Sequence, residues 1–176
     1  MTCINDGTYG FDYASGELRL SLLRSAAYSG LPVFDRPILP QDRFSPRIDQ
    51  GERLFTFWIN GGSSTERRER IDREALSHNE KPFTLSFFPS GRGTPHPPAV
   101  NLSDAVVLMS AFKKAEQSDD YIIRLFEPTG LARSTVLEFP SLGMSQTIDL
   151  AGFEIRTLRI DPHNRTIQAY DLLEQN

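Results

Sequence analysis

Hydrophobic and polar residues alternate near the start of the chain. Leu18, Leu20 and Leu22 recur at every second position, with Arg19 and Ser21 between them. This period is typical of a strand with one face against a core and the other face toward solvent or a partner. Two groups of turn-forming residues precede these leucines in the sequence, Asn5-Asp6-Gly7 and Ser15-Gly16. The pattern therefore predicts an antiparallel hairpin.

The next part of the chain predicts a mixture of elements. Residues 31–49 hold four prolines among charges, which indicates a long and largely extended loop. Glu52 to Asn60 is apolar on both sides and predicts a strand with little exposed surface. Ser63 is expected to cap a helix that runs to about His78, and residues 83–88 alternate like a further strand. Glycines and prolines in residues 91–98 predict a mobile loop and a boundary between two lobes.

The expected helix carries a narrow apolar stripe and a block of charges. The stripe consists of Ile71, Ala75 and Leu76. The block Glu66-Arg67-Arg68-Glu69-Arg70 permits two interpretations, a binding patch or a solvated helix face with alternating charge. We take the second interpretation, because alternating charge is the ordinary composition of an exposed helix face.

Short apolar runs follow one another from residue 106 onward, each separated from the next by turn residues. Spacings of about ten to fifteen residues, with almost no helical pattern between the runs, predict an antiparallel β-sandwich. Residues 106–109 are apolar on both faces and predict a central strand. The runs are residues 106–112, 121–126, 134–139, 145–150 and 153–160.

Composition narrows the classes of protein that the chain can represent. Its 176 residues, 39% of them hydrophobic, suffice for one domain or two small ones. The net charge of −4 comes from acids interleaved with arginines, so we expect no nucleic-acid partner. The single cysteine, Cys3, excludes an internal disulfide framework and favours a cytoplasmic location. The start of the chain lacks a basic or apolar leader and no stretch is apolar enough to span a membrane, so we expect no membrane partner.

Residues that could carry out chemistry are sparse. The three histidines and the cysteine are far apart in the sequence and lack the spacing of a local zinc site: His78, His96, His163 and Cys3. Asp35, Asp42 and Asp49 lie in the proline-bearing loop, where two of them could converge as an acid/base pair. Loop carboxylates are more often solvated or turn-forming, so we expect no catalytic residue and no metal ligand.

Six stretches in order along the chain form a series of motifs: residues 4–12, 18–25, 49–55, 106–116, 122–130 and 153–159. Together they resemble the C-terminal region of the glycoside hydrolase family 38 α-mannosidases. Residues 4–12 and 18–25 resemble its "NDxxYG(Y/F)D" hairpin and the "LRLSLLRSP" segment that follows. Four more segments resemble motifs of the same region: residues 49–55 resemble "DxGxHxF", residues 106–116 resemble "VVLSALKKAED", residues 122–130 resemble "IIRLYExxG" and residues 153–159 resemble "PFEIKTLRL". The chain departs from the family at Arg53, where the family usually has His, and at Ala26-Ala27, which replace a common proline.

The resemblance implies a mainly β architecture with one short helix. Residues 1–95 would be the C-terminal part of a large galactose-mutarotase-like supersandwich, with a long loop and the helix. Residues 96–176 would be a smaller Ig-like antiparallel β-sandwich. In the family, the zinc ligands and the catalytic aspartates lie in an N-terminal α/β barrel whose motifs are absent from these residues. The implied chain is therefore non-catalytic and needs no cofactor of its own, while zinc or another divalent metal belongs to the parent enzyme's catalytic domain.

The same resemblance implies partners and one candidate site. Gln41-Asp42-Arg43 resembles a "QDR" segment from which some family members place an arginine near the active site. Arg43, with Asp42, is thus the candidate for substrate binding, because a planar guanidinium suits carboxylates and sugar hydroxyls. The competing interpretation is that Arg43 only orders the loop. The implied partners are the N-terminal catalytic barrel and a mannose-containing oligosaccharide.

Two other functions remain open at this point. An autonomous carbohydrate-binding module would need exposed aromatic residues on one sheet face, and the candidates are Trp58, Tyr121 and Tyr170. A free-standing hydrolase would need turnover of an α-mannoside by this chain alone. If the earlier strands of the implied sheet are missing from this chain, the hairpin has an unpaired strand edge at residues 18–23. Such an edge would recruit another chain, so we expect a homo-oligomer.

Overall fold

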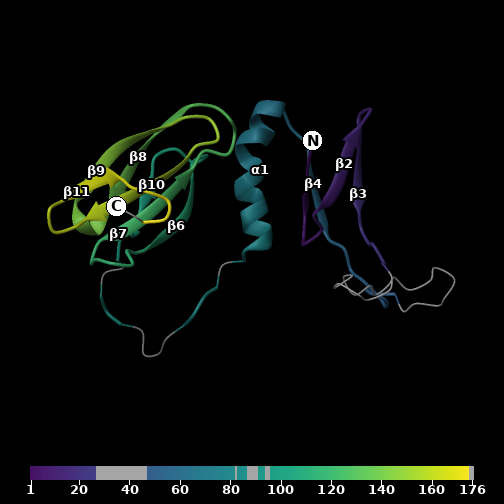
Figure 1. The fold of residues 1–176 in the computed structure, drawn as a ribbon, viewed down its shortest axis with the longest axis horizontal. Coiled ribbons are helices and arrows are strands. Elements are labelled where there is room, and N and C mark those ends of the chain that lie inside the picture. Colours follow the sequence, from purple (N-terminus) through teal and green to yellow (C-terminus); the bar gives the residue numbers. More distant parts are fainter. Residues whose placement is uncertain (27–46, 82, 87–90, 94–95, 175–176) are drawn as a thin grey trace, which may run out of the picture. The chain divides into compact units, whose positions relative to one another are not determined.

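The structure is a computed structural model that describes residues 1–26, 47–81, 83–86, 91–93 and 96–174. Within these residues the chain is mainly β, with antiparallel sheets and one α-helix (Figure 1). It forms two compact units: unit 1 comprises residues 61–176 with Met1, and unit 2 comprises residues 2–60. The predicted fold class, a mainly β protein with a β-sandwich and one short helix, is confirmed.

Unit 1 contains two antiparallel sheets. The strands of the first lie in the order β11-β10-β7-β6 and those of the second in the order β5-β8-β9. Their bounds are β5 (Asn101–Leu102), β6 (Leu108–Lys114), β7 (Tyr121–Phe126), β8 (Arg133–Phe139), β9 (Met144–Leu150), β10 (Ile155–Asp161) and β11 (Thr166–Ala169). A 3₁₀ turn, η1 (Pro140–Leu142), joins β8 to β9. The five strands expected from the apolar runs are present, and β5 and β11 are additional.

The core of unit 1 lies between these sheets. Alternate residues of facing strands point inward, so β7 and β10 of one sheet meet β8 and β9 of the other. The Phe112 and Phe139 rings extend this contact with centroids 6.0 Å apart. The buried cluster comprises Val107, Ile123, Leu125, Leu137, Phe139, Met144, Ile148, Leu150, Leu158 and Ile160. The apolar faces of the strands therefore build a sandwich.

The prediction of a central strand at residues 106–109 was wrong. Strand β6 begins only at Leu108 and forms an edge of its sheet. Val107 is buried in the core cluster, but it lies in the segment before the strand. Met109, in the strand itself, is exposed. The apolar run thus reflects a connecting segment that packs into the core rather than a strand covered on both faces.

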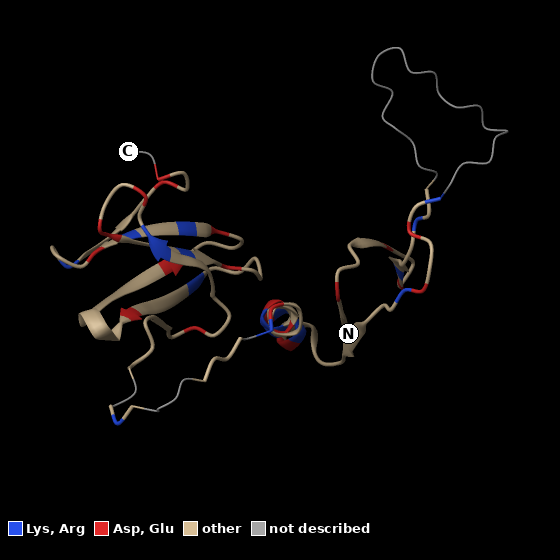
Figure 2. Cartoon of the chain, turned by 90° about the horizontal axis from the view of Figure 1, so that it is seen from below, with Lys and Arg blue, Asp and Glu red and all other residues tan. Residues whose placement is uncertain are grey.

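Helix α1 (Ser64–Asn79) belongs to unit 1 and confirms the predicted helix. Ser63 is its N-cap, and the Ser63 hydroxyl accepts a hydrogen bond of 3.2 Å from the Glu66 amide. Charges of both signs are interspersed along the helix (Figure 2). The prediction that the charged block is a solvated face was wrong for Arg67, which is buried and forms an ion pair with Glu74. The apolar stripe is also weaker than expected, since Leu76 is exposed.

Unit 2 contains two separate pairs of strands. Strand β1 (Thr2–Asn5) pairs with β4 (Phe57–Asn60), and β2 (Gly10–Ala14) pairs with β3 (Glu17–Ser21), both antiparallel. Ser15 and Gly16 join β2 to β3 with φ angles of 53° and 83°, the left-handed region that a two-residue hairpin turn requires. The predicted hairpin is thus confirmed.

Two further expectations differ from the structure. Strand β4 covers only the second half of the stretch expected from Glu52 to Asn60, and its Ile59 is exposed. Residues 83–86 form no strand and are exposed, although they alternate, since they have no ladder partner among the described residues. Most of the proline-bearing loop, residues 27–46, lies outside the described residues.

The two units divide between Asn60 and Gly61, whereas the sequence placed a boundary between residues 95 and 96. Helix α1 accounts for the difference, because its Arg73 side chain donates to the carbonyls of Ala105 and Val107 and so joins the helix to unit 1. The assignment of residues 1–95 and 96–176 to two sandwich domains stays a prediction. No helix in the described parts of the chain is long and apolar enough to cross a membrane.

Candidate functional site

The most enclosed polar group of unit 1 is the carboxylate of Glu127, directly after β7. Its side chain is fully buried. The carboxylate accepts hydrogen bonds from the amides of Thr129 at 2.9 Å, Gly130 at 2.7 Å and Phe153 at 3.1 Å, and from the Thr129 hydroxyl. It therefore ties two turns together, one after β7 and one before β10.

Arg133, the first residue of β8, completes this cluster. Its Nε donates to Glu127 at 3.2 Å, and its other nitrogens reach Asp104 at 3.4 Å and Glu69 of α1 at 2.9 Å. One guanidinium thus holds three carboxylates from three parts of unit 1. We call Glu127, Arg133, Asp104 and Glu69 the buried ion cluster.

The pKa of the Glu127 carboxyl determines whether this residue could transfer a proton near neutral pH. Burial raises the pKa of its carboxyl, but the hydrogen bonds from Thr129, Phe153 and Gly130 outweigh burial and lower the pKa to about 2. A general acid or base works best with a pKa near the working pH. A carboxylate with such a low pKa stays ionised near neutral pH, so Glu127 does not suit proton transfer, whereas its contacts hold the two turns together.

The contact between Glu69 and Arg133 yields a test of how α1 is attached. We expect Glu69→Gln to weaken the attachment by less than about 1 kcal/mol, because Glu69 is partly exposed and solvent screens the pair. Hydrogen exchange measured by mass spectrometry should show faster exchange in α1 and unchanged exchange in β7 and β8. Arg68→Gln, on the exposed part of the same turn, is the control. Equal exchange in the two variants would contradict a role of the Glu69–Arg133 ion pair in attaching α1.

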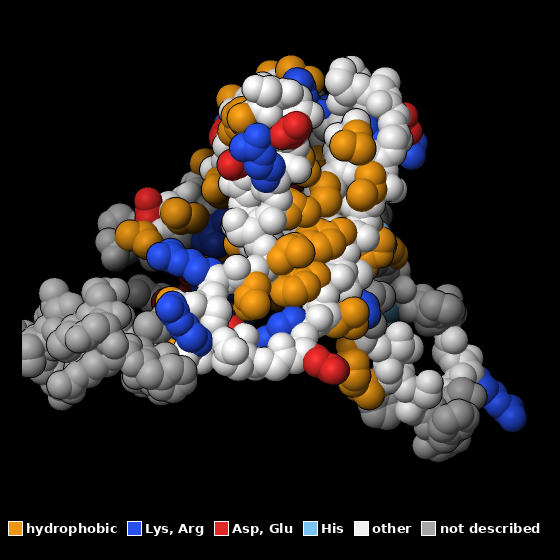
Figure 3. Space-filling model, turned by 90° about the vertical axis from the view of Figure 1, so that its right-hand side faces the viewer, with side chains coloured by type: hydrophobic (Ala, Val, Ile, Leu, Met, Phe, Trp, Pro, Cys, Tyr) orange, Lys and Arg blue, Asp and Glu red, His pale blue; other side chains and the backbone are white. Residues whose placement is uncertain are grey.

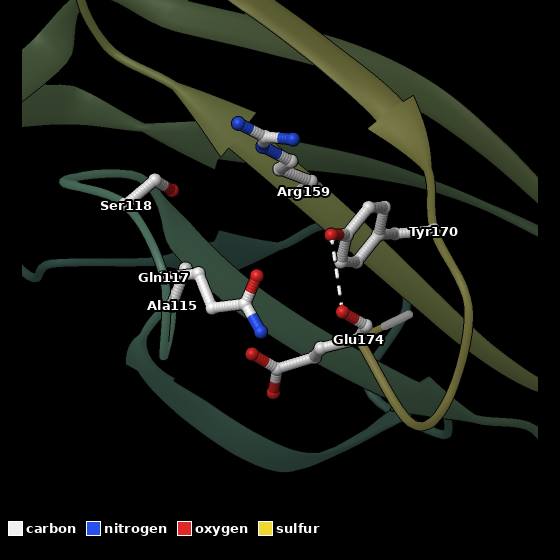
Figure 4. Close-up of a pocket in the computed structure, with 6 residues that line it drawn as sticks. All are labelled: Ala115, Gln117, Ser118, Arg159, Tyr170 and Glu174. Atoms are coloured by element: carbon white, nitrogen blue, oxygen red, sulfur yellow. Dashed lines mark hydrogen bonds between the residues drawn. The ribbon is translucent and has the colours of Figure 1, made fainter. Parts of the chain in front are cut away.

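A small polar hollow lies beside the end of the described chain (Figure 4). Its volume is about 120 Å³, below the roughly 300 Å³ at which ligand pockets begin. Its polar groups bind one another: Arg159 lies 5.5 Å from the Tyr170 ring centroid, the Tyr170 hydroxyl donates to the Glu174 carbonyl at 3.3 Å, and Lys113 pairs with Glu174 at 2.6 Å. These mutual contacts and the small volume do not suit a sugar ring.

The aromatic residues proposed for sugar stacking are divided between the two units. Trp58 lies in β4 of unit 2 and is half-buried. Tyr121 lies in β7 of unit 1, with its ring centroid 5.7 Å from that of Phe112. Tyr170 is covered by Arg159 in the polar hollow. The three residues therefore form no common platform within either unit.

A different set of aromatic residues is exposed in unit 2, and the sequence analysis did not single it out. Phe11 and Tyr13 of β2 lie opposite Leu20 and Leu18 of β3, respectively. Residues directly opposite in an antiparallel pair share a face, so these four side chains form one surface, the apolar hairpin face. The signal in the sequence is the alternation of Tyr9, Phe11 and Tyr13 with polar residues and glycine. Figure 3 shows a group of hydrophobic side chains on the face that it draws.

The predicted substrate-binding residues, Arg43 and Asp42, lie outside the described residues, as does Asp35. Asp49 is exposed and forms an ion pair of 3.2 Å with Arg53, so it is already engaged. Among the residues that the structure describes, no group of three or more histidines, cysteines and carboxylates could hold a metal ion.

Comparisons with known proteins found a similarity to a glycosidase. No protein-family profile matches it, and no solved structure matches it. It is 25% identical over 190 aligned residues to "Alpha-mannosidase G" of Dictyostelium discoideum. The alignment covers 90% of this chain and 16% of that protein, so the chain spans about one sixth of the relative's length. The chain is thus similar to one part of an α-mannosidase.

Proposed function

We propose that the chain is the non-catalytic C-terminal β region of an α-mannosidase of glycoside hydrolase family 38. Its parent would hydrolyse α-mannosides in glycans with a divalent metal in a separate catalytic barrel, which this region supports. The similarity to Alpha-mannosidase G over 90% of the chain carries the proposal.

Contacts between two of the resembling segments also support this proposal. Glu127 and Gly130 belong to the segment that resembles "IIRLYExxG", and Phe153 begins the segment that resembles "PFEIKTLRL". The Phe153 and Gly130 amides both donate to the Glu127 carboxylate. The two resembling segments, more than twenty residues apart, thus meet in one buried cluster. A buried cluster that holds two segments together suits a region that supports a catalytic domain rather than one that carries catalytic residues.

Within this proposal, Arg43 and Asp42 reach the parent's sugar cleft from the proline-bearing loop. An arginine in that loop offers planar, directed donors to sugar hydroxyls. We place the protein in the cytoplasm, and the support is its single cysteine, Cys3, since reducing compartments do not require paired cysteines.

A replacement experiment tests the proposal. The matching sixth of Alpha-mannosidase G is deleted, or is replaced by this chain, and hydrolysis of an aryl α-mannoside is measured with added zinc. We expect no turnover by this chain alone, loss of activity on deletion, and recovery in the replacement. In the replacement, Arg43→Gln should lower kcat/KM at least tenfold, and Arg24→Gln is the control. Turnover by the isolated chain would instead establish a free-standing hydrolase.

The alternative is an autonomous carbohydrate-binding module. Exposed aromatic side chains at Tyr9, Phe11 and Tyr13 favour it, since aromatic faces stack on sugar rings. Titration of the isolated chain with α-mannotriose by calorimetry separates this alternative from the main proposal. Saturable binding that Phe11→Ala removes would support the module, whereas no heat of binding at millimolar sugar would exclude it.

A further inference from the structure

The β2–β3 hairpin has two chemically distinct faces. Its register pairs Phe11 with Leu20 and Tyr13 with Leu18, so one face carries only aromatic and aliphatic side chains. Tyr9 before β2 and Leu22 after β3 are also exposed and apolar. When apolar and polar residues alternate along both strands of a pair, the apolar face is ordinarily buried against another part of a protein.

The opposite face of the hairpin carries the polar residues. Asp12 lies opposite Arg19, and Ala14 lies opposite Glu17. Arg19 forms ion pairs with Glu17 at 2.9 Å and with Asp12 at 4.0 Å. The charges are thus segregated from the apolar hairpin face and partly neutralise one another. The polar face therefore suits contact with water, and its side chains do not cover the hydrophobic side chains on the other face.

The apolar hairpin face is large for a surface left in water. Tyr9 is 86% exposed, and Phe11 and Tyr13 are each 70% exposed. An aromatic side chain buries about 150–250 Å², so Phe11, Tyr13 and the adjoining Tyr9 together expose on the order of 450 Å². With Leu18, which is 41% exposed, this area lies in the upper part of the roughly 300–600 Å² of the largest apolar patch on a typical monomer. It is a substantial part of the roughly 800 Å² that each partner contributes to a standard interface.

We propose that the apolar hairpin face packs against the same face of a second copy, forming a homodimer. Two copies of a surface that carries only apolar side chains can face one another without bringing like charges together, as a twofold interface requires. A two-stranded hairpin is also marginally stable alone, and stacking two of them face to face creates the two-layer packing that sheets need. This contact uses the sheet face, whereas the sequence had suggested the strand edge at residues 18–23.

The leucines decide between a second copy and a glycan. A sugar ring that stacks on an aromatic side chain still needs hydrogen-bonding partners for its hydroxyls. Leu18 and Leu20 lie directly across from Tyr13 and Phe11 and would bury those hydroxyls against hydrocarbon. A protein surface made of the same side chains incurs no such cost. The dimer is independent of the proposed mannosidase role, because it concerns the isolated chain.

Sedimentation equilibrium of the isolated chain from 1 to 100 µM tests the dimer. We expect twice the chain mass in the upper part of this range. Phe11→Lys should raise the dissociation constant at least tenfold, because it buries an unpaired charge in the interface. Ala14→Lys is the matched control, since it places the same charge on the polar face, opposite Glu17, and should leave the mass unchanged.

A second measurement keeps the test valid if Phe11→Lys unfolds the hairpin. In a mixture of isotope-labelled and unlabelled wild-type chain, intermolecular nuclear Overhauser effects should join the rings of Phe11 and Tyr13 to leucine methyls of the other copy. A monomeric wild-type chain at 100 µM would overturn the proposal, as would equal loss of dimer in both lysine variants. Dissociation of the dimer by α-mannotriose would assign the face to a glycan instead. None of these results bears on the replacement experiment in Alpha-mannosidase G.

Discussion

Glu127→Gln is expected to lower the free energy of unfolding by about 3 kcal/mol at neutral pH. The substitution keeps the shape of the side chain but removes the charge that Arg133 and three amides contact. Breaking one partner of a buried pair costs about 3–5 kcal/mol, and the retained shape places this variant at the lower limit. Urea denaturation followed by circular dichroism measures the loss. Glu138→Gln, on the exposed side of β8, is the control and should lie within about 0.5 kcal/mol of wild type.

The same carboxylate predicts how stability varies with pH. Its pKa is about 2 in the folded chain and ordinarily 4.5, so the folded state favours the ionised form. A lowered pKa contributes stability above pH 4.5, and that contribution disappears as the pH falls through 2. The difference of about 2.5 units corresponds to about 3 kcal/mol. The stability gap between wild type and Glu127→Gln should therefore narrow from pH 5 to pH 2. A constant gap would show that the charge of Glu127 is not what stabilises unit 1.

The sequence pattern predicted those elements whose structure is determined by residues close together in the sequence. The hairpin turn at Ser15-Gly16 and the cap at Ser63 rest on interactions within a few residues, and both are present. The strands β7 to β10 follow alternating apolar positions that one sandwich core buries. These features could be predicted because their causes lie within single segments.

Features that depend on distant residues could not be predicted in the same way. Whether Glu69 faces solvent depends on the position of Arg133, and the helical pattern carries no information about β8. The edge position of β6 depends on which strand lies beside it. For the candidate site, Arg43 and Asp42 rest on resemblance and stay predictions. The apolar hairpin face was visible as alternation in β2, but its exposure depends on the tertiary structure.

The second large effect is expected at Gly152, where two turns approach closely. A Cβ atom at this position would lie 2.5 Å from the carbonyl carbon of Gly130 and 3.0 Å from its Cα atom. Both of these atoms belong to the backbone, so no side-chain rotation relieves the clash. Gly152→Ala should therefore destabilise unit 1 by about 3 kcal/mol, the upper part of the range for overpacking. Gly61→Ala is the control, because its Cβ would meet nothing within 4 Å.

The clash at Gly152 also connects with Glu127, and this gives a sharper test. Separating the two turns would pull the Phe153 amide from the Glu127 carboxylate, which it reaches at 3.1 Å. Gly152→Ala should then remove part of what Glu127→Gln removes, so the double variant should lose less than the sum of the single losses. A coupling energy of about 1 kcal/mol is expected for residues that share one cluster. Strict additivity would mean that the turns are held together by packing alone, and that the buried ion cluster and the glycine contact stabilise unit 1 separately.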